Sequence, residues 1–226
     1  MPGKANPSCK IEAFTLVELL SVLTVVLTLG SLLWTAMLRG KQRAFQVVCL
    51  NHLKQWGLAT QLYTLEHEDW LPRDGAPNGT SRENGWYIDL PRALGIPDYH
   101  QMPWRTNGTH PPRTSIWICP SNRKRSNGIN LFHYCLNAYV NGRGAGSQVK
   151  HHSIPLPGST IWMFDNGGRA AVAGQNNVHT NVHNQGAQFV FLDGHAAKFN
   201  HTNYWDFVRN RGRLGNPSLQ WKPRNR

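Results

Sequence analysis

An uninterrupted apolar stretch at residues 14–38 constrains this chain more than any other feature of its sequence. The stretch reads FTLVELLSVLTVVLTLGSLLWTAML, and Glu18 is its only ionisable residue. As an α-helix it would extend about 37 Å, which exceeds the roughly 30 Å thickness of a bilayer's hydrocarbon core. A secretory signal has an apolar region of only about 7–15 residues. The stretch therefore predicts a membrane-spanning helix.

Glu18 is the unusual residue of this stretch. A carboxylate inside a membrane helix costs about 2.5 kcal/mol or more on insertion scales, so it requires a partner unless it lies at the headgroup level. Because a buried charge persists when it is paired, we expect Glu18 to meet a positive group.

The residues around Glu18 resemble the class III signal of type IV pilins and type II secretion pseudopilins. A polar leader at residues 1–13 ends in the small residue Ala13, and the run Phe-Thr-Leu-Val-Glu follows it. The resemblance implies that prepilin peptidase cleaves between Ala13 and Phe14 and that the Phe14 nitrogen is methylated. Ala13 stands where that family more often has Gly. In a filament, Glu18 would neutralise the Phe14 amino group of a neighbouring subunit.

The sequence after the apolar stretch predicts that the helix continues to about residue 70. No proline occurs from Phe14 until Pro72, and apolar residues recur at steps of three and four within 42–68. We expect 39–70 to be an amphipathic continuation of the helix, packed under a head formed by 71–226. Each of three glycines in the helix costs about 1 kcal/mol relative to Ala. These candidate bends are Gly30, Gly40 and Gly57.

The head is expected to be an α+β domain with a small antiparallel sheet, as in a pilin. Two apolar segments within 187–199 flank Asp193-Gly194, which predicts a hairpin with a type I′ turn. A short helix at 204–209 and a loose basic tail follow. Further short strands, bounded by turn residues, are predicted at 86–90, 115–119, 131–140 and 160–165.

A second resemblance concerns the head. His183, nine further residues and then Asp193-Gly194 are similar to the H-X9-DG element near the C-terminus of a prepilin-like family. That family also has a Cys-Asn-x-Leu-Lys-Gln-like helix segment and a later Cys-Pro. This chain has CLNHLKQ from Cys49 and a Cys-Pro pair at Cys119. The resemblance implies an architecture more firmly than an activity.

The H-X9-DG residues allow two interpretations. In the structural one, the Asp193 carboxylate caps backbone N–H groups of the turn, and His183 pins the preceding loop to the hairpin. In the functional one, His and Asp side chains hold a divalent metal, and this donor set suits zinc or another transition metal better than calcium. The candidate ligands are Asp165, His179, His183, Asp193 and His195. No other cofactor is expected.

Three cysteines remain after loss of the leader, which contains Cys9. We favour a Cys49–Cys119 disulfide, which would close a loop of about 70 residues and remove roughly 4 kcal/mol of unfolded-state entropy. A Cys119–Cys135 disulfide is the alternative. Because no Cys-x-x-Cys spacing occurs, a metal site built on the cysteines is disfavoured.

The chain is strongly basic, with 24 Lys and Arg against 12 Asp and Glu and a net charge of +12. Such a charge favours polyanionic partners, and the nine tryptophans either fill the core or offer stacking surfaces for bases or sugars. The basic residues are scattered, however, which favours solvated surface charge. Small basic clusters occur at Arg39/Lys41/Arg43, Arg123/Lys124/Arg125 and Arg209/Arg211/Arg213.

No catalytic motif is present, so we do not expect an enzyme. We expect a structural subunit of a type IV pilus-like or type II secretion pseudopilus filament, which self-associates through its N-terminal helix on an inner-membrane assembly platform. It would cross the bacterial inner membrane once, with its head in the periplasm or outside the cell in a filament. The positive-inside rule does not favour this orientation, which follows from the first resemblance. The alternative is a filament-tip or membrane-anchored protein that captures DNA or acidic glycan through a basic, Trp-bearing head.

Overall fold

The computed structural model describes residues 15–109, 111–141 and 147–223. Ala13 and Phe14 lie outside these residues, so cleavage and methylation stay predictions. The chain divides into two compact units, Met1–Lys41 and Gln42–Arg226.

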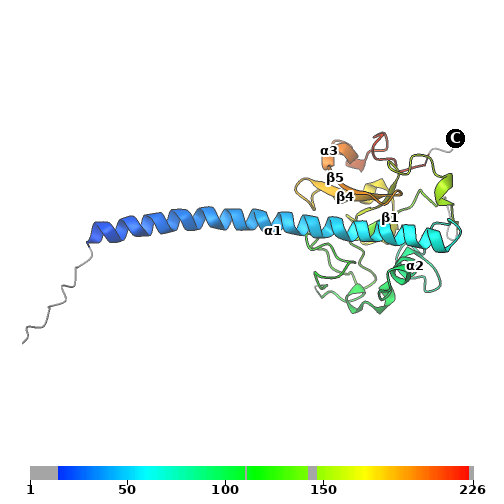
Figure 1. Cartoon of the computed structure of the whole chain (residues 1–226), viewed down its shortest axis with the longest axis horizontal. Coiled ribbons are helices and arrows are strands. Elements are labelled where there is room, and N and C mark those ends of the chain that lie inside the picture. Colours follow the sequence, from blue (N-terminus) through cyan, green and yellow to red (C-terminus); the bar gives the residue numbers. More distant parts are fainter. Residues whose placement is uncertain (1–14, 110, 142–146, 224–226) are drawn as a thin grey trace, which may run out of the picture. The chain divides into compact units, whose positions relative to one another are not determined.

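Helix α1, Leu16–Glu66, confirms the long N-terminal helix and contributes residues to both units (Figure 1). Within it, an 18-residue window has a mean hydropathy of 2.2, and none of that window is buried. By length and composition, it is the one helix of the described residues that is apolar enough to cross a membrane. This is consistent with a single-pass membrane protein. The helix ends where Glu68 and Asp69 adopt positive φ angles of 51° and 69°.

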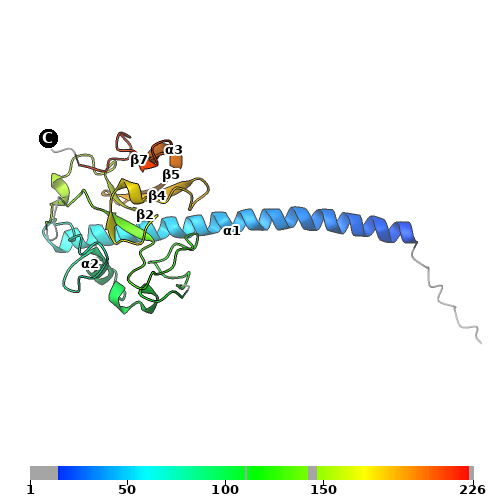
Figure 2. The same ribbon diagram turned by 180° about the vertical axis from the view of Figure 1, so that it is seen from behind.

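The second half of α1 is amphipathic, as the three- and four-residue steps predict. Its buried apolar positions are Cys49, Leu53, Trp56, Ala59 and Tyr63. This half passes between the sheet and the loop region that contains α2, Trp86–Ala93 (Figures 1 and 2). The rings of Trp56 and Trp86 are 5.6 Å apart, which places α2 directly against α1.

The head contains a five-stranded sheet in the order β3-β1-β2-β4-β5. All neighbouring strands are antiparallel except β1 and β3, which are parallel. The α+β expectation is therefore confirmed. The strands are β1 (Tyr134–Asn137), β2 (Ile161–Asp165), β3 (Val172–Ala173), β4 (Gly186–Phe191), β5 (Ala196–Asn200) and a separate pair, β6 (Trp205–Asp206) with β7 (Arg211–Gly212). The short helices are α3 (His201–Tyr204), η1 (Tyr99–Gln101), η2 (Pro103–Arg105), η3 (His151–Ser153) and η4 (Gln175–Asn177).

The three interior strands, β1, β2 and β4, are buried along their whole length because the sheet is covered on two faces. On one face, Trp162 and Val190 join the apolar cluster of α1. On the other, Phe164 and Phe189 pack with Trp221 near the C-terminus. The expectation of a loose tail is therefore wrong as far as Trp221, which is 1% exposed.

Side-chain hydrogen bonds also fasten α1 to the sheet. The Trp162 indole donates to Thr60 Oγ1 at 2.7 Å, and Gln61 Nε2 donates to the Leu192 carbonyl at 2.6 Å. At Gly57, an added Cβ would lie 2.8 Å from Val190 Cγ2 and 3.0 Å from the Gly194 carbonyl oxygen. Gly57 is therefore a point of close approach to the β4–β5 hairpin, and α1 continues through it.

Several predicted elements differ. The expected strand at 86–90 is helix α2, because a short apolar run buried all round does not distinguish a strand from a helix. The expected strand at 115–119 is a turn in which Ile118 N–H donates to the Ser115 carbonyl. The expected helix at 204–209 begins earlier, at α3, and gives way to β6.

The β4–β5 hairpin is confirmed, but its turn is not type I′. A type I′ turn needs positive φ at both central residues, and in this turn only Gly194 has one, at 89°. Phe191 N–H donates to the His195 carbonyl, and Gly194 N–H donates to the Phe191 carbonyl. The connection is thus a longer loop that ends in a left-handed glycine.

Candidate functional site

The Glu18 carboxylate is bound within its own chain. Its Oε2 accepts hydrogen bonds from the Thr15 backbone N–H at 2.9 Å and from the Thr15 hydroxyl at 2.6 Å. The Glu18 N–H donates in return to Thr15 Oγ1 at 3.3 Å. This reciprocal pattern is a capping box, whose Thr-x-x-Glu signature is visible in the sequence but was not part of the sequence interpretation. The expected pairing with a neighbour's Phe14 amine stays a prediction.

The head is cross-linked by a disulfide between Cys49 of α1 and Cys119, as favoured from the sequence. The two residues are 70 positions apart, and their Cα atoms lie 5.0 Å from each other. Cys135 on β1 is a buried free thiol, and burial raises its pKa well above the ordinary range. The alternative Cys119–Cys135 pairing is therefore not formed.

His183 lies against this disulfide and not against the Asp193-Gly194 turn, so the predicted pinning of the hairpin is wrong. Its Nε2 is 3.5 Å from Cys119 Sγ and 3.2 Å from Asp165 Oδ2. Because β4 separates His183 from the turn, the nine residues between His183 and Asp193 include the six residues of that strand. The expected capping by Asp193 is confirmed: its Oδ1 accepts from His195 N–H at 3.0 Å and lies 2.6 Å from His195 Nδ1.

The five predicted metal ligands do not converge. Asp165 and His183 are adjacent, but Asp193 and His195 pair with each other at the surface, beyond the opposite end of β4. Among the residues that the structure describes, one group of three or more potential ligand atoms lies within 4.8 Å of one another. That group is Cys49, Cys119 and His183. The five candidates therefore do not form one site, although Asp165 and His183 lie together and the His179 N–H donates to the Asp165 carbonyl at 3.0 Å.

The surroundings of Asp165 and His183 are closely packed. Their side chains are 1% and 0% exposed. Asp165 Oδ2 accepts the Gln188 backbone N–H at 2.7 Å, whereas Asp165 Oδ1 and His183 Nδ1 have no hydrogen-bond partner. Buried polar groups without partners are uncommon, so these two atoms mark the position as unusual.

A second buried histidine, His133, holds the backbone around Cys119 in place. His133 Nδ1 accepts the Cys119 backbone N–H at 3.2 Å, and its Nε2 lies 3.1 Å from the Lys124 carbonyl oxygen. Burial lowers the pKa of His133 to about 4, so the neutral ring holds these two bonds at neutral pH.

We refer to Cys49, Cys119, Asp165 and His183 as the disulfide cluster.

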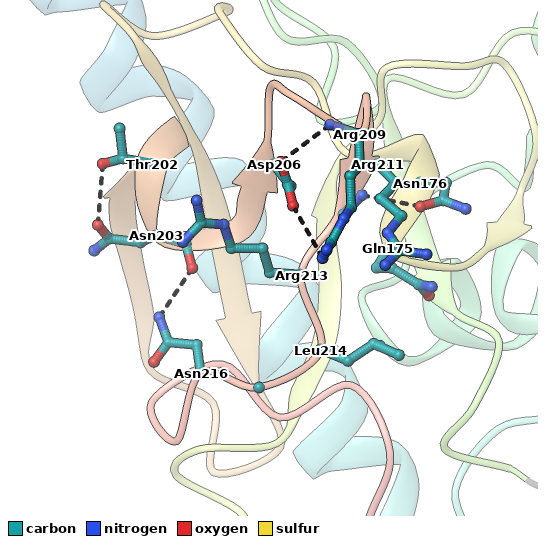
Figure 3. Close-up of a pocket in the computed structure, with 12 residues that line it drawn as sticks. Gln175, Asn176, Thr202, Asn203, Asp206, Arg209, Arg211, Arg213, Leu214 and Asn216 are labelled. Atoms are coloured by element: carbon teal, nitrogen blue, oxygen red, sulfur yellow. Dashed lines mark hydrogen bonds and ion pairs between the residues drawn. The ribbon is translucent and has the colours of Figure 1, made fainter.

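The third basic patch of the sequence lines an open surface pocket of about 1020 Å³ between η4, α3 and the β6–β7 pair (Figure 3). Asp206 Oδ1 accepts the backbone N–H groups of Val208 and Arg209, each at 3.1 Å. The Arg209 N–H is the main cause that holds the pKa of Asp206 below its ordinary value. The pocket also contains amide side chains, and its three arginines are Arg209, Arg211 and Arg213.

The tryptophans of the head do not form a stacking surface, so the alternative in which they stack on bases or sugars is not borne out. Seven are buried in the head: Trp56, Trp86, Trp104, Trp117, Trp162, Trp205 and Trp221. Trp70 is 38% exposed, and Lys150 Nζ lies 5.3 Å from its ring centroid. The core-filling interpretation is the one that the structure bears out.

Comparison with protein-family models, with curated proteins and with solved structures finds no match for this chain.

Proposed function

We propose that this chain is a non-enzymatic structural subunit of a type IV pilus-like or type II secretion pseudopilus filament. In this proposal, prepilin peptidase removes residues 1–13, and copies of the chain assemble on an inner-membrane platform through the apolar half of α1. The head lies outside the cytoplasm, in the periplasm or in the extracellular part of the filament.

The observation that carries the proposal is the uncovered apolar surface of α1. Leu16 is 79% exposed and Leu33 is 69% exposed, and none of the most apolar window is buried within the chain. Such a surface needs lipid or other helices around it, and a filament core supplies helices from neighbouring copies. The disulfide supports a compartment outside the cytoplasm, where such bonds persist.

The capping box gives the assembly proposal a sharper test than removal of Glu18 alone. Glu18→Gln keeps an acceptor for Thr15 but has no charge, because Gln also serves in a capping box. Thr15→Ala removes the cap, at a cost of about 1 kcal/mol, but keeps the charged carboxylate. We expect Glu18→Gln to insert into the membrane and to be excluded from filaments, and Thr15→Ala to be incorporated.

Assembly is measured as the amount of chain that is cross-linked to neighbouring copies in sheared filaments, compared with the amount in the membrane fraction. Mass spectrometry of the mature N-terminus, which should begin with methylated Phe14, tests processing separately. Normal incorporation of Glu18→Gln together with poor incorporation of Thr15→Ala would show that Glu18 acts only as a cap. That result would overturn the charge-pairing part of the proposal.

A second candidate function is capture of DNA or acidic glycan, and the three-arginine pocket favours it (Figure 3). Arg213 Nε donates to the Trp205 carbonyl at 3.1 Å and supports the fold, so Arg209 and Arg211 are the better residues to change. Phosphate contacts by basic residues make binding salt-dependent. The double variant Arg209→Gln/Arg211→Gln should weaken binding of the detergent-solubilised chain to DNA or heparin.

The matched control replaces two exposed arginines elsewhere in the head, as Arg82→Gln/Arg123→Gln. Binding measured by fluorescence anisotropy at low and high salt should fall further for the pocket variant. Equal losses for both pairs would show that only net charge matters, which would remove the pocket as a site.

A further inference from the structure

We propose that the disulfide cluster is a zinc site when its cysteines are reduced, with Cys49, Cys119 and His183 as ligands and Asp165 as the fourth. The site and the disulfide are then alternative states of the same residues. This set shares Asp165 and His183 with the five candidates named from the sequence, but it adds the two sulfur atoms and leaves out the hairpin. It is also independent of whether the chain forms a filament.

Two of the ligand-to-ligand distances already match those of a tetrahedral zinc shell. With Zn–N of about 2.1 Å and Zn–S of about 2.3 Å, a nitrogen and a sulfur ligand are about 3.6 Å apart. His183 Nε2 and Cys119 Sγ are 3.5 Å apart. A nitrogen and a carboxylate ligand are expected at about 3.4 Å, and His183 Nε2 and Asp165 Oδ2 lie 3.2 Å apart.

The same His183 nitrogen faces both the sulfur and the carboxylate, as a shared metal ion would require. Reduction must let the two sulfur atoms separate to about 3.8 Å, the spacing of two thiolates on one zinc. The ligand atoms of the two cysteines and His183 all lie within 4.8 Å of one another. Asp165 is outside this group, so its carboxylate has to move towards the sulfur atoms as they separate.

The polar groups of the cluster are left incompletely satisfied without an ion. Asp165 Oδ1 and His183 Nδ1 have no partner although both residues are buried. Reduction would add two buried thiols beside them. A divalent cation bound to His183 Nε2 would give the two thiolates and the Asp165 carboxylate a positive partner, whereas His183 Nδ1, on the opposite side of the ring, would lie outside its coordination shell. Gln188 supports the site from outside, because its N–H holds Asp165 Oδ2 at 2.7 Å and its Nε2 donates to the Gln46 carbonyl at 2.7 Å.

Electrons and protons balance in the exchange between the disulfide state and the zinc-bound state. A dithiol reductant supplies two electrons and two protons to the Cys49–Cys119 bond and is itself oxidised to a disulfide. Zinc then binds as the two thiols lose their protons to water. The complex of Zn²⁺ with two thiolates, one carboxylate and a neutral imidazole has a net charge of −1. A disulfide oxidant, which accepts two electrons from the thiolates and two protons from water and becomes a dithiol, releases the ion and restores the Cys49–Cys119 bond.

The test uses the full chain in detergent with Cys9→Ser, reduced by a phosphine that becomes its oxide. Co²⁺ serves as the probe, because thiolate-to-cobalt charge-transfer bands report sulfur ligation and the visible bands report tetrahedral geometry. We expect one equivalent of Co²⁺ to bind to the reduced protein, Zn²⁺ to displace it, and the oxidised protein to show no such bands. Circular dichroism follows the fold in parallel.

Variants separate the site from general thiol binding. Cys135→Ala should bind as the parent does, because Cys135 is not a member of the cluster. His183→Gln should weaken binding by about 100-fold or more, and Asp165→Asn by about 10-fold or more. Asp165→Asn is the second variant in case His183→Gln fails to fold.

Three outcomes would overturn the proposal. One is a reduced, folded protein without cobalt–thiolate bands. Another is a set of bands that neither His183→Gln nor Asp165→Asn weakens. The third is a reduced protein that unfolds and does not recover its native circular dichroism when Zn²⁺ is added, since a zinc site would restore the fold.

Discussion

Gly57 of α1 offers a test in which the sign of the effect is the opposite of the usual one. Alanine is favoured over glycine by about 1 kcal/mol inside a helix, so Gly→Ala normally stabilises. Here the new Cβ would lie 2.8 Å from Val190 Cγ2 and 3.0 Å from the Gly194 carbonyl oxygen. Both obstacles are stiff, because one belongs to a β-branched core residue and the other to the backbone.

The expected size follows from these two opposing effects. Overpacking in a well-packed core costs about 1–3 kcal/mol, of which the helix preference offsets about 1 kcal/mol. Gly57→Ala should therefore lower the free energy of unfolding by about 1 kcal/mol. For a unit of this size, such a loss lowers Tm by about 2–4 °C. Thermal unfolding of the full chain in detergent, followed by near-UV circular dichroism, measures it.

Two further variants make this prediction refutable. Gly40 lies in the same helix with nothing within 4 Å of an added Cβ, so Gly40→Ala should not lower Tm. Val190→Ala is destabilising alone, but it removes the methyl group nearest to the new Cβ, so the double variant with Gly57→Ala should be more stable than additivity predicts, by about 0.5 kcal/mol or more. A stabilising Gly57→Ala, or strictly additive effects, would refute the close approach.

Three other predictions concern the head. Replacement of both Cys49 and Cys119 by Ser should lower the free energy of unfolding by about 4 kcal/mol, as measured with denaturant, because the 70-residue loop is no longer closed. In a chain with Cys9→Ser, the thiol of Cys135 should resist maleimide until the protein is unfolded, because it is buried and burial raises its pKa; rapid labelling of the folded chain would contradict this. Burial raises the pKa of Asp74 to about 6, so its ionisation destabilises the folded head as pH rises from about 4 to above 6. Asp74→Asn should therefore raise Tm at pH 7 and leave it nearly unchanged at pH 4, and a difference that does not vary with pH would count against this account.

Much of the fold was predictable because its signals are local. The apolar stretch and the three- and four-residue steps after it determine α1, and Asp193-Gly194 between two apolar segments determines the β4–β5 hairpin. The segment at 86–90 was not predictable in this way. Its apolar residues are buried from several sides, so the pattern has no polar face that distinguishes α2 from a strand.

The disulfide cluster was only half predictable. The entropy of closing a long loop favoured the Cys49–Cys119 disulfide, and His183 and Asp165 were both recognised as candidate metal ligands. Their convergence depends on the pairing of β2 with β4, which places the end of one strand beside the start of the other. The sequence interpretation joined His183 to Asp193 because of their spacing, although a β-strand keeps the two ends of such a spacing apart. The role of Gly57 was missed because a glycine at a close approach and a glycine at a bend have the same sequence signal.

The continuity of α1 has a practical consequence for anyone who wishes to produce the head without the apolar first half of that helix. A truncation placed after the helix, at the apparent border between helix and sheet, would discard half of the disulfide and the Trp56 ring at the centre of the aromatic core. The face of the sheet that packs against α1, with Trp162 and Val190, would then be exposed to water. A soluble fragment has to begin near Gln42, where the compact unit itself begins, so the last part of the helix is as much a component of the head as any strand.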